Sequence, residues 1–181
     1  MQKTFLVTGG AGFIGTNLVL ALLEQGYKVK VVDDLSAGDN RSRLPKEVDF
    51  YKQDIRDTKA LTDILAEVDV VIHLAALPRI QFSIDEPVVV HDVNVNGTLS
   101  VLEAAKKAGV KRVVFAASSA AYGDQDILPL TTDLPVSPKS PYALHKYIGE
   151  EYLRLWSNLF SLETVSLRFF NVYGPHLDPE G

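Results

Sequence analysis

A glycine-rich turn near the N-terminus constrains this sequence more than any other feature. Residues 4–8 form a short run typical of a buried strand, and Gly9, Gly12 and Gly15 follow it before a segment with helical spacing. Glycines at these places permit a tight turn, let a ligand approach the backbone, and let the helix pack closely against the strand. The amides at the start of the helix would then stabilise an anion. The turn therefore predicts a site for the pyrophosphate of a dinucleotide.

The rest of the chain alternates strand-like runs with segments of helical periodicity. Several of the apolar runs are rich in Val, Ile and Phe, which is typical of strands buried on both faces of a parallel sheet. We therefore predict an α/β domain over residues 1–175, a Rossmann doubly wound parallel sheet with helices on both faces. Residues 176–181 form a polar tail. The predicted strands are residues 4–8, 27–32, 48–51, 68–74, 112–117 and 164–169.

The composition restricts the functions that such a domain could serve. Of 181 residues, 46% are hydrophobic and 23% are charged, as in ordinary globular proteins. The net charge of −5 disfavours a nucleic-acid partner, which requires a basic surface. The chain has no cysteine, which excludes disulfides and thiolate ligands, and we expect no metal site. We find no membrane-spanning run and no signal peptide, and therefore expect a cytoplasmic protein.

An acidic pair at the end of the second predicted strand bears on the choice of dinucleotide. Asp33 and Asp34 follow Val32, where an acidic side chain can hydrogen-bond both hydroxyls of an adenosine ribose. A carboxylate there would also repel a 2′-phosphate, so NAD is favoured over NADP. We assign the ribose contact to Asp33, whereas Asp34 is either a second contact or only the start of the turn.

A tyrosine and a lysine four residues apart are candidates for proton transfer. Tyr142 and Lys146 lie on a predicted helix that begins with Ser140 and Pro141, so both side chains project from one face. An ammonium group close to a phenol would lower the pKa of Tyr142 from about 10 toward neutrality. Ser118 follows the fifth predicted strand, at the edge where open α/β sheets bind ligands. Alone, such a pair is usually a surface feature, but the glycine-rich turn favours catalysis here.

Several segments together resemble the extended short-chain dehydrogenase/reductases, and in particular the NAD-dependent epimerases and dehydratases that act on nucleotide sugars. Each motif is weak alone, but their order and spacing together are specific. The matching segments are residues 8–15, 33–36, 54–55, 73–76, 94–98, 118–123, 142–146 and 168–175.

The resemblance implies roles for individual residues. Ser118, Tyr142 and Lys146 would form the catalytic set, Asp54 would reach the adenine, and Asn171 would contact the substrate together with Ser118. Arg79 and Ser83 either line a sugar pocket or belong to a solvated loop. The residues implied to contact NAD are Gly9, Gly12, Phe13, Ile14, Gly15, Asp33, Asp34, Asp54, Ile55, Leu74, Ala75, Ala76, Asn94, Tyr142 and Lys146.

In the resembling family, the two residues after the catalytic serine distinguish dehydratases from epimerases. In 4-epimerisation, a base takes the proton of the C4 hydroxyl while NAD⁺ takes hydride from C4, and hydride then returns to the opposite face. The resembling dehydratases carry an Asp-Glu pair where this chain has Ser119 and Ala120. We therefore predict an epimerase that acts on a UDP-hexose or a related nucleotide sugar. A dehydratase or reductase of the same family, and a non-catalytic NAD-binding module, are the alternatives.

The resembling enzymes continue past the segment that matches residues 168–175. We expect the C-terminal substrate-binding domain to be absent, so that the chain binds NAD but epimerises weakly alone, because remote contacts position a substrate for reaction. The helices predicted around 91–108 and 142–159 carry apolar residues on more than one face. That pattern fits burial within the fold or the helix-paired homodimer that the resemblance implies.

Overall fold

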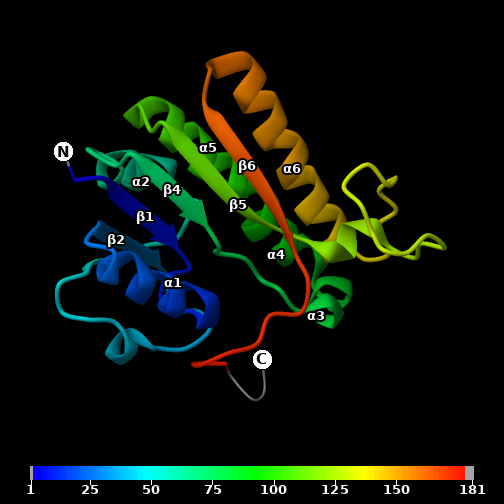
Figure 1. Cartoon of the computed structure of the whole chain (residues 1–181), viewed down its shortest axis with the longest axis horizontal. Helices are drawn as coiled ribbons and strands as arrows, with labels where there is room; N and C mark the ends of the chain where they lie inside the picture. The colour runs from blue at the N-terminus through cyan, green and yellow to red at the C-terminus, as the bar shows by residue number, and fades with distance from the viewer. Residues whose placement is uncertain (1, 178–181) are drawn as a thin grey trace.

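Six parallel strands form one sheet in the computed structural model, which describes residues 2–177 (Figure 1). The strand order is β3-β2-β1-β4-β5-β6, and every neighbouring pair is parallel. This order is that of a Rossmann sheet, so the predicted fold class is confirmed. The predicted strand ends differ from the observed ones by at most two residues. The strands are β1 (Thr4–Thr8), β2 (Lys28–Asp33), β3 (Asp49–Lys52), β4 (Val70–His73), β5 (Arg112–Ser118) and β6 (Glu163–Phe169).

Helices pack on both faces of the sheet. Consecutive strand residues point to opposite faces, so Leu6 and Val7 belong to two separate cores. The core around Leu6 is closed by α2, α5 and α6, and the core around Val7 is closed by α1. Among the described helices, none is long and apolar enough to cross a membrane. The helices are α1 (Phe13–Glu24), α2 (Thr58–Ile64), α3 (Ile80–Asp85), α4 (Pro87–His91), α5 (Gly97–Ala108) and α6 (Pro141–Phe160).

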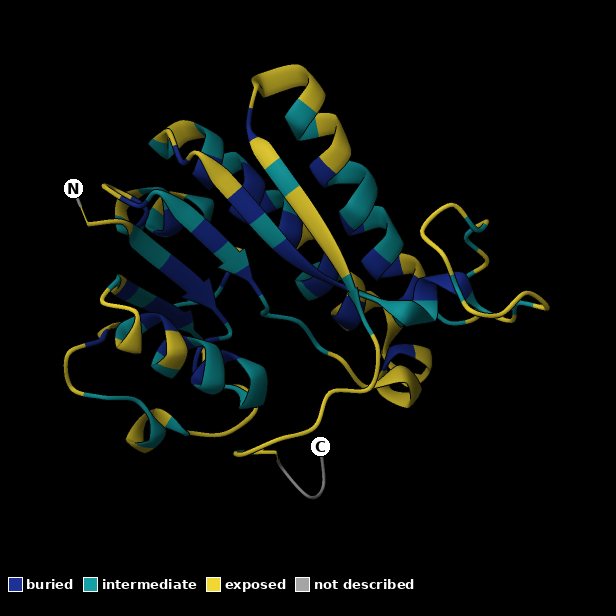
Figure 2. Cartoon of the chain, in the orientation of Figure 1, coloured by how far each residue is buried: buried dark blue, intermediate teal, exposed yellow. Residues whose placement is uncertain are grey.

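The outer strand β6 is the least covered part of the sheet. Figure 2 shows β5 buried over most of its length and β6 largely exposed, with Val165 and Leu167 at 39% and 42%. On the α1 side, an apolar pocket of about 190 Å³ extends over β4, β5 and β6 and reaches Leu18. Helix α1 therefore covers this face of the sheet only around β1 and β2. Residues 178–181 of the predicted tail lie outside the described residues.

The helix predicted around residues 91–108 is interrupted by one wider turn. A π-helical turn, Asp92–Asn96, joins α4 to α5, and Gly109 caps the C-terminal end of α5 in the left-handed conformation. The Thr98 hydroxyl donates to the Asn94 carbonyl oxygen at 2.7 Å and so gives this carbonyl a partner. Single π-helical turns frequently occur at functional sites. A helix is thus present around residues 91–108 as predicted, but an apolar repeat of three or four does not reveal the wider turn within it.

A buried histidine connects the ends of β1 and β4 to α5. The Thr98 hydroxyl gives its only proton to the Asn94 carbonyl oxygen, so it accepts from Nε2 of His73 at 3.0 Å. Nδ1 of the neutral ring then accepts from the Thr8 hydroxyl at 2.7 Å, and this hydroxyl also accepts from the Ala75 amide. His73 is 1% exposed, and this burial lowers its pKa to about 3. The imidazole is thus neutral and has a structural role at the end of β4.

The neutral state of His73 predicts a specific acid sensitivity. The folded-state pKa of about 3 lies below the ordinary value of 6.5, so the unfolded chain binds the proton more readily. Between pH 6.5 and about 3, this residue alone should reduce the free energy of unfolding by about 1.4 kcal/mol per pH unit. Urea titrations of wild type and His73→Gln at several pH values measure the difference. Parallel pH profiles for the two proteins would contradict the prediction.

Candidate active site

The glycine-rich turn connects β1 to α1 and packs against the end of β4. Gly9 has a φ of +67°, and a Cβ at this position would lie 2.8 Å from the Ala75 nitrogen. A Cβ on Gly15 would lie 2.2 Å from the Gly9 carbonyl oxygen. Gly12 precedes α1, which begins without a side-chain cap, so the first amides of the helix are open to an anion. The turn therefore fits a pyrophosphate on its outer side.

Asp33 and Asp34 have different roles at the end of β2. The Asp33 carboxylate accepts from the Ala11 amide at 3.0 Å and from the Leu35 amide at 2.9 Å. Burial raises the pKa of Asp33, while these two hydrogen bonds oppose the shift. Asp34 instead accepts from the amide and the hydroxyl of Ser36. Asp33 thus attaches the glycine-rich turn to β2 and lies where a ribose contact is predicted, whereas Asp34 shapes the following turn.

The pair predicted to reach the adenine follows β3. Asp54 forms an ion pair with Arg56, which also pairs with Asp92 of the π-helical turn at 2.5 Å. Hydrogen bonding by the Arg56 side chain lowers the pKa of Asp54. Ile55 is buried, and its side chain fills the space beside Gly97, where a Cβ would lie 2.6 Å from the Ile55 Cδ1. The structure therefore connects this pair to the π-helical turn, and its contact with the adenine stays a prediction.

The segment after β4 is held in place by Asn94. Leu74, Ala75 and Ala76 are half-buried beside the glycine-rich turn. The Asn94 amide is 3% exposed; it donates to the Leu77 carbonyl oxygen at 3.0 Å and accepts from the Leu77 amide at 2.8 Å. Asn94 therefore fixes the course of the segment predicted to lie along the cofactor. The resemblance placed Asn94 near the cofactor but did not reveal that both ends of its side-chain amide bind Leu77.

Close packing of α6 on β5 brings Lys146 to the end of that strand. A Cβ on Gly149 would lie 2.6 Å from the ring of Phe115, so the helix approaches the strand closely here. The Lys146 ammonium donates to the Ala116 carbonyl oxygen at 2.7 Å and lies 5.9 Å from the centre of the Tyr142 ring. Burial lowers the pKa of Lys146 to about 8. The ammonium group is thus held inside the fold by a backbone carbonyl.

The structure brings Tyr142 close to Ser118 but corrects the predicted shift in the pKa of Tyr142. Burial raises the pKa of Tyr142, and a hydrogen bond with the Ser118 side chain lowers it by a smaller amount. The predicted lowering of the Tyr142 pKa toward neutrality is therefore wrong for the free chain. The physical reason is that burial disfavours the phenolate, while Lys146 directs its charge at Ala116 rather than at the phenol.

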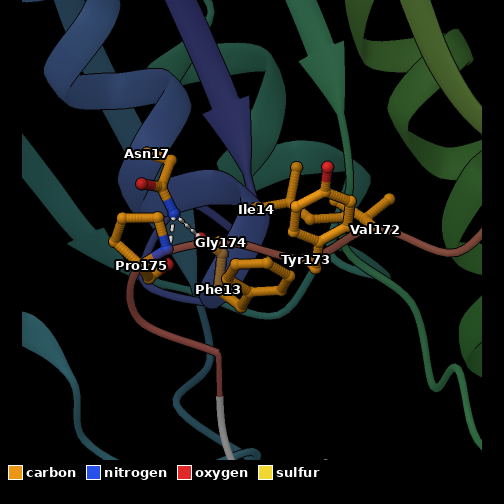
Figure 3. Close-up of a pocket in the computed structure, with 7 residues that line it drawn as sticks. All are labelled: Phe13, Ile14, Asn17, Val172, Tyr173, Gly174 and Pro175. Carbon is orange, nitrogen blue, oxygen red and sulfur yellow. Dashed lines mark hydrogen bonds between the residues drawn. The ribbon is translucent and has the colours of Figure 1, made fainter.

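The segment after β6 crosses the sheet edge and meets the start of α1. Figure 3 shows Asn17 of α1 beside Pro175, whose carbonyl oxygen accepts from the Asn17 side chain at 2.8 Å. Arg43 holds the next carbonyl, that of His176, at 3.2 Å. Asn171 is exposed at the beginning of this segment. A pocket of about 250 Å³ separates the segment from the glycine-rich turn; it is lined by Phe13, Ile14, Asn17, Val172, Tyr173, Gly174 and Pro175.

The sequence did not predict the contacts of Asn17 and Arg43 with this segment, and it did not predict the helix α3. Asn17 and Arg43 were not identified because an isolated side chain that binds a distant backbone carbonyl leaves no local pattern. The solvated loop considered for residues 79–83 is largely the helix α3, which Arg79 precedes. Ser83 on this helix is fully buried. The structure therefore gives Ser83 neighbours within the protein rather than an open pocket.

The chain belongs to the NAD dependent epimerase/dehydratase family, whose model matches residues 5–181. A UDP-glucose 4-epimerase from Mycolicibacterium smegmatis is 44% identical to it, over 97% of this chain and 58% of the relative. A Thermus thermophilus UDP-glucose 4-epimerase, solved in complex with NAD, is 41% identical with a TM-score of 0.93, covering 98% of this chain and 58% of that one. The family expected from the motifs is thus confirmed, and its cofactor is NAD.

Two further solved structures belong to two different types of enzyme, an epimerase and a dehydratase. UDP-glucose 4-epimerase from Thermotoga maritima, solved with UDP-glucose, is 39% identical with a TM-score of 0.94, covering 98% of this chain and 59% of that one. A dTDP-glucose 4,6-dehydratase from Streptomyces venezuelae, solved with NAD, is 36% identical with a TM-score of 0.92 and the same coverage. The chain spans somewhat more than half the length of these relatives, and its fold resembles both types of enzyme.

The packing of the glycine-rich turn predicts a sharp effect of one added methyl group. Gly15→Ala should displace the Gly9 carbonyl, destabilise the fold by about 1–3 kcal/mol and remove measurable NAD binding. The matched control is Gly109→Ala, which also adds a methyl group but meets nothing within 4 Å and should cost about 1 kcal/mol. Calorimetric titration with NAD compares the two variants. Equal NAD affinity in both would contradict the assignment of the turn.

The buried ammonium of Lys146 predicts a gain in stability when it is removed. At pH 7, Lys146→Met should raise the free energy of unfolding by about 2 kcal/mol, the desolvation cost less the lost hydrogen bond. The folded-state pKa of about 8 lies below the ordinary 10.5, so wild type gains stability as pH rises from 8 to 10.5. The advantage of the variant should therefore shrink across this interval. Denaturant titrations at pH 7 and pH 10 test this; a less stable variant at pH 7 would refute it.

Proposed function

We propose that this chain is the cofactor-binding and proton-transfer part of a UDP-hexose 4-epimerase. The observation that carries the proposal is that Tyr142 lies close to Ser118 at the end of β5, on the same helix as Lys146, which is one helical turn away. β5 is separated from the glycine-rich turn after β1 by β4 alone, so both sites lie at the same edge of the sheet. The UDP-glucose 4-epimerases among the relatives support this choice of reaction.

The residues around the turn fit NAD. The glycine-rich turn and the uncapped start of α1 would hold the pyrophosphate, and Asp33 would hold the adenosine ribose. The Asp33 carboxylate, next to the turn, disfavours the 2′-phosphate of NADP. When bound, NAD supplies the hydride acceptor and donor that epimerisation at C4 needs. The half-buried strip from Leu74 to Ala76, held by Asn94, would support the remainder of the cofactor.

The proton would move between the substrate hydroxyl and Tyr142. Ser118 would hydrogen-bond the hydroxyl at C4 and keep it close to the phenol. Because burial raises the pKa of Tyr142, the phenol is protonated in the free chain, and it must lose this proton before it can act as a base. Lys146 would favour that loss if its ammonium turned from the Ala116 carbonyl toward the phenolic oxygen. The proton then returns from Tyr142 to the sugar oxygen when hydride returns to C4.

Dehydration is the main alternative, because a dehydratase has nearly the same fold. Elimination of water across C5 and C6 needs an additional acid and base. Ser119 and Ala120 occupy the turn directly after Ser118, and neither carries a carboxyl group. The lack of a carboxyl group at these two positions favours the epimerase.

We also propose that the protein is cytoplasmic.

A homodimer through α5 and α6 is part of the same proposal. On α6, Leu144, Leu155 and Leu159 are exposed at 45%, 39% and 66%. On α5, by contrast, most of the apolar residues belong to the core. The exposed leucines of α6 therefore provide the main support for a helix-paired contact.

Turnover by the chain itself tests the proposed reaction. The protein is incubated with NAD and, separately, with UDP-glucose, UDP-galactose and their N-acetyl forms, and the products are separated by chromatography. We expect slow interconversion of at least one pair. Tyr142→Phe keeps the ring but removes the hydroxyl, so it should reduce the rate by about 10²–10⁴ while NAD still binds. Bound NAD without conversion of any pair would refute the proposal, and a 4-keto product would favour the dehydratase.

A further inference from the structure

Ser83 is a buried hydroxyl that the proposed reaction does not use. It lies on α3 with a relative exposure of 0%. Its hydroxyl donates to the Ile80 carbonyl oxygen at 2.6 Å and accepts from the backbone amide of Tyr142 at 3.1 Å. The second bond joins residues that are 59 positions apart in the sequence. Ser83 thus contacts the main chain of the tyrosine that we place at the centre of proton transfer.

The amides at the start of α6 show why this distant contact is needed. Pro141 is the first residue of the helix and has no amide proton. The Ala143 amide donates to the Ser140 hydroxyl at 3.2 Å, and the Leu144 amide donates to the Ser140 carbonyl oxygen at 3.0 Å. The Tyr142 amide is the remaining donor of the first turn, and Ser83 is its acceptor. Local capping therefore satisfies the neighbours of Tyr142, while Tyr142 depends on α3.

Tyr142 is consequently held at both of its ends. Its amide is bound to Ser83, and its phenol lies beside the Ser118 side chain, close enough for that hydroxyl to affect its pKa. The first contact leads to α3 and thus to the chain that follows β4, and the second leads to the end of β5. The position of the ring relative to the sheet edge is therefore defined by two separate segments. A reacting group displaced by about 1 Å can lose about 10² in rate.

We propose that Ser83 is a positioning residue, which fixes the backbone of Tyr142 so that its phenol meets Ser118 and the substrate hydroxyl. The inference rests on the proposed function, since it assigns the proton transfer to Tyr142. Ser83 acts through the tyrosine amide and does not touch the sugar. Its role replaces the sugar contact considered for it from the sequence, because its buried hydroxyl already makes two hydrogen bonds to protein groups.

A pair of alanine variants separates positioning from general stabilisation of α6. Ser83→Ala removes the acceptor of the Tyr142 amide, and Ser140→Ala removes the acceptor of the adjacent Ala143 amide. Each variant loses one hydrogen bond at the start of α6, and Ser83→Ala also loses the bond to the Ile80 carbonyl, so its melting temperature should fall somewhat more than that of Ser140→Ala. Only Ser83→Ala should lower kcat, by about tenfold or more, with KM for the sugar nucleotide within about twofold of wild type.

A spectroscopic readout tests the same idea without turnover. The protein is labelled with ¹³C at the Cζ atom of tyrosine, and the Tyr142 signal among seven is assigned with Tyr142→Phe. Ser83→Ala should shift or broaden this signal, whereas Ser140→Ala should leave it as in wild type. Ser83→Cys, in which a weakly accepting thiol fills the same space, should fold normally and behave like the alanine variant.

The outcomes distinguish this inference from the proposed function. A wild-type chain that converts no sugar nucleotide refutes the proposed function, and the Tyr142 signal still decides whether Ser83 positions the ring. An unchanged Tyr142 signal and kcat in Ser83→Ala would overturn the inference. Equal losses of kcat in Ser83→Ala and Ser140→Ala would also overturn it, since these would show only fraying of the helix end.

Discussion

The hydrogen-bonded connection between Thr8, His73 and Thr98 joins the segments after β1 and β4, which the cofactor is proposed to contact, to the π-helical turn. Thr8 and His73 are paired across β1 and β4, so the bond between their side chains joins adjacent strands where both of them end. The Thr8 hydroxyl also receives the Ala75 amide, against which Gly9 packs. Through Thr98, the same connection reaches the carbonyl of Asn94 in the π-helical turn. Because the imidazole donates at one nitrogen and accepts at the other, only its neutral form serves all of these partners.

The sequence predicted those parts of the fold and site that depend on local spacing. The glycines at 9 and 15 are needed for close approaches within a strand-turn-helix unit, and Asp33 ends the neighbouring strand; these features have a fixed spacing along the chain. The π-helical turn was missed because its effect on periodicity is small. Asn17 and Ser83 were missed as contacts to Pro175 and Tyr142 because tertiary structure, rather than spacing, selects those partners.

For Tyr142 and Lys146 too, spacing predicted the position of each residue, whereas tertiary packing determines its pKa. Spacing correctly placed Tyr142 and Lys146 on one helix, and the ammonium was then expected to lower the pKa of the phenol. Packing changes both pKa values because each side chain leaves solvent: the pKa of the phenol rises, and that of the ammonium falls to about 8. The nearest polar partner of Lys146 is a backbone carbonyl, which a residue pattern does not identify. Burial, rather than the sequence motif, therefore sets the protonation state of the free chain.

The precision of the site depends on how α6 is attached to the sheet. Ser83 holds its first turn, the close approach of Gly149 to Phe115 fixes its middle, and Glu150 pairs with Arg168 of β6 at 2.7 Å. The side chains of this ion pair are only 12% and 16% exposed, so loss of either partner would leave the other charge poorly solvated. The three attachments involve α3, β5 and β6. A rotation of α6 would have to break contacts with all three, and a helix held in this way keeps Tyr142 and Lys146 in register with Ser118.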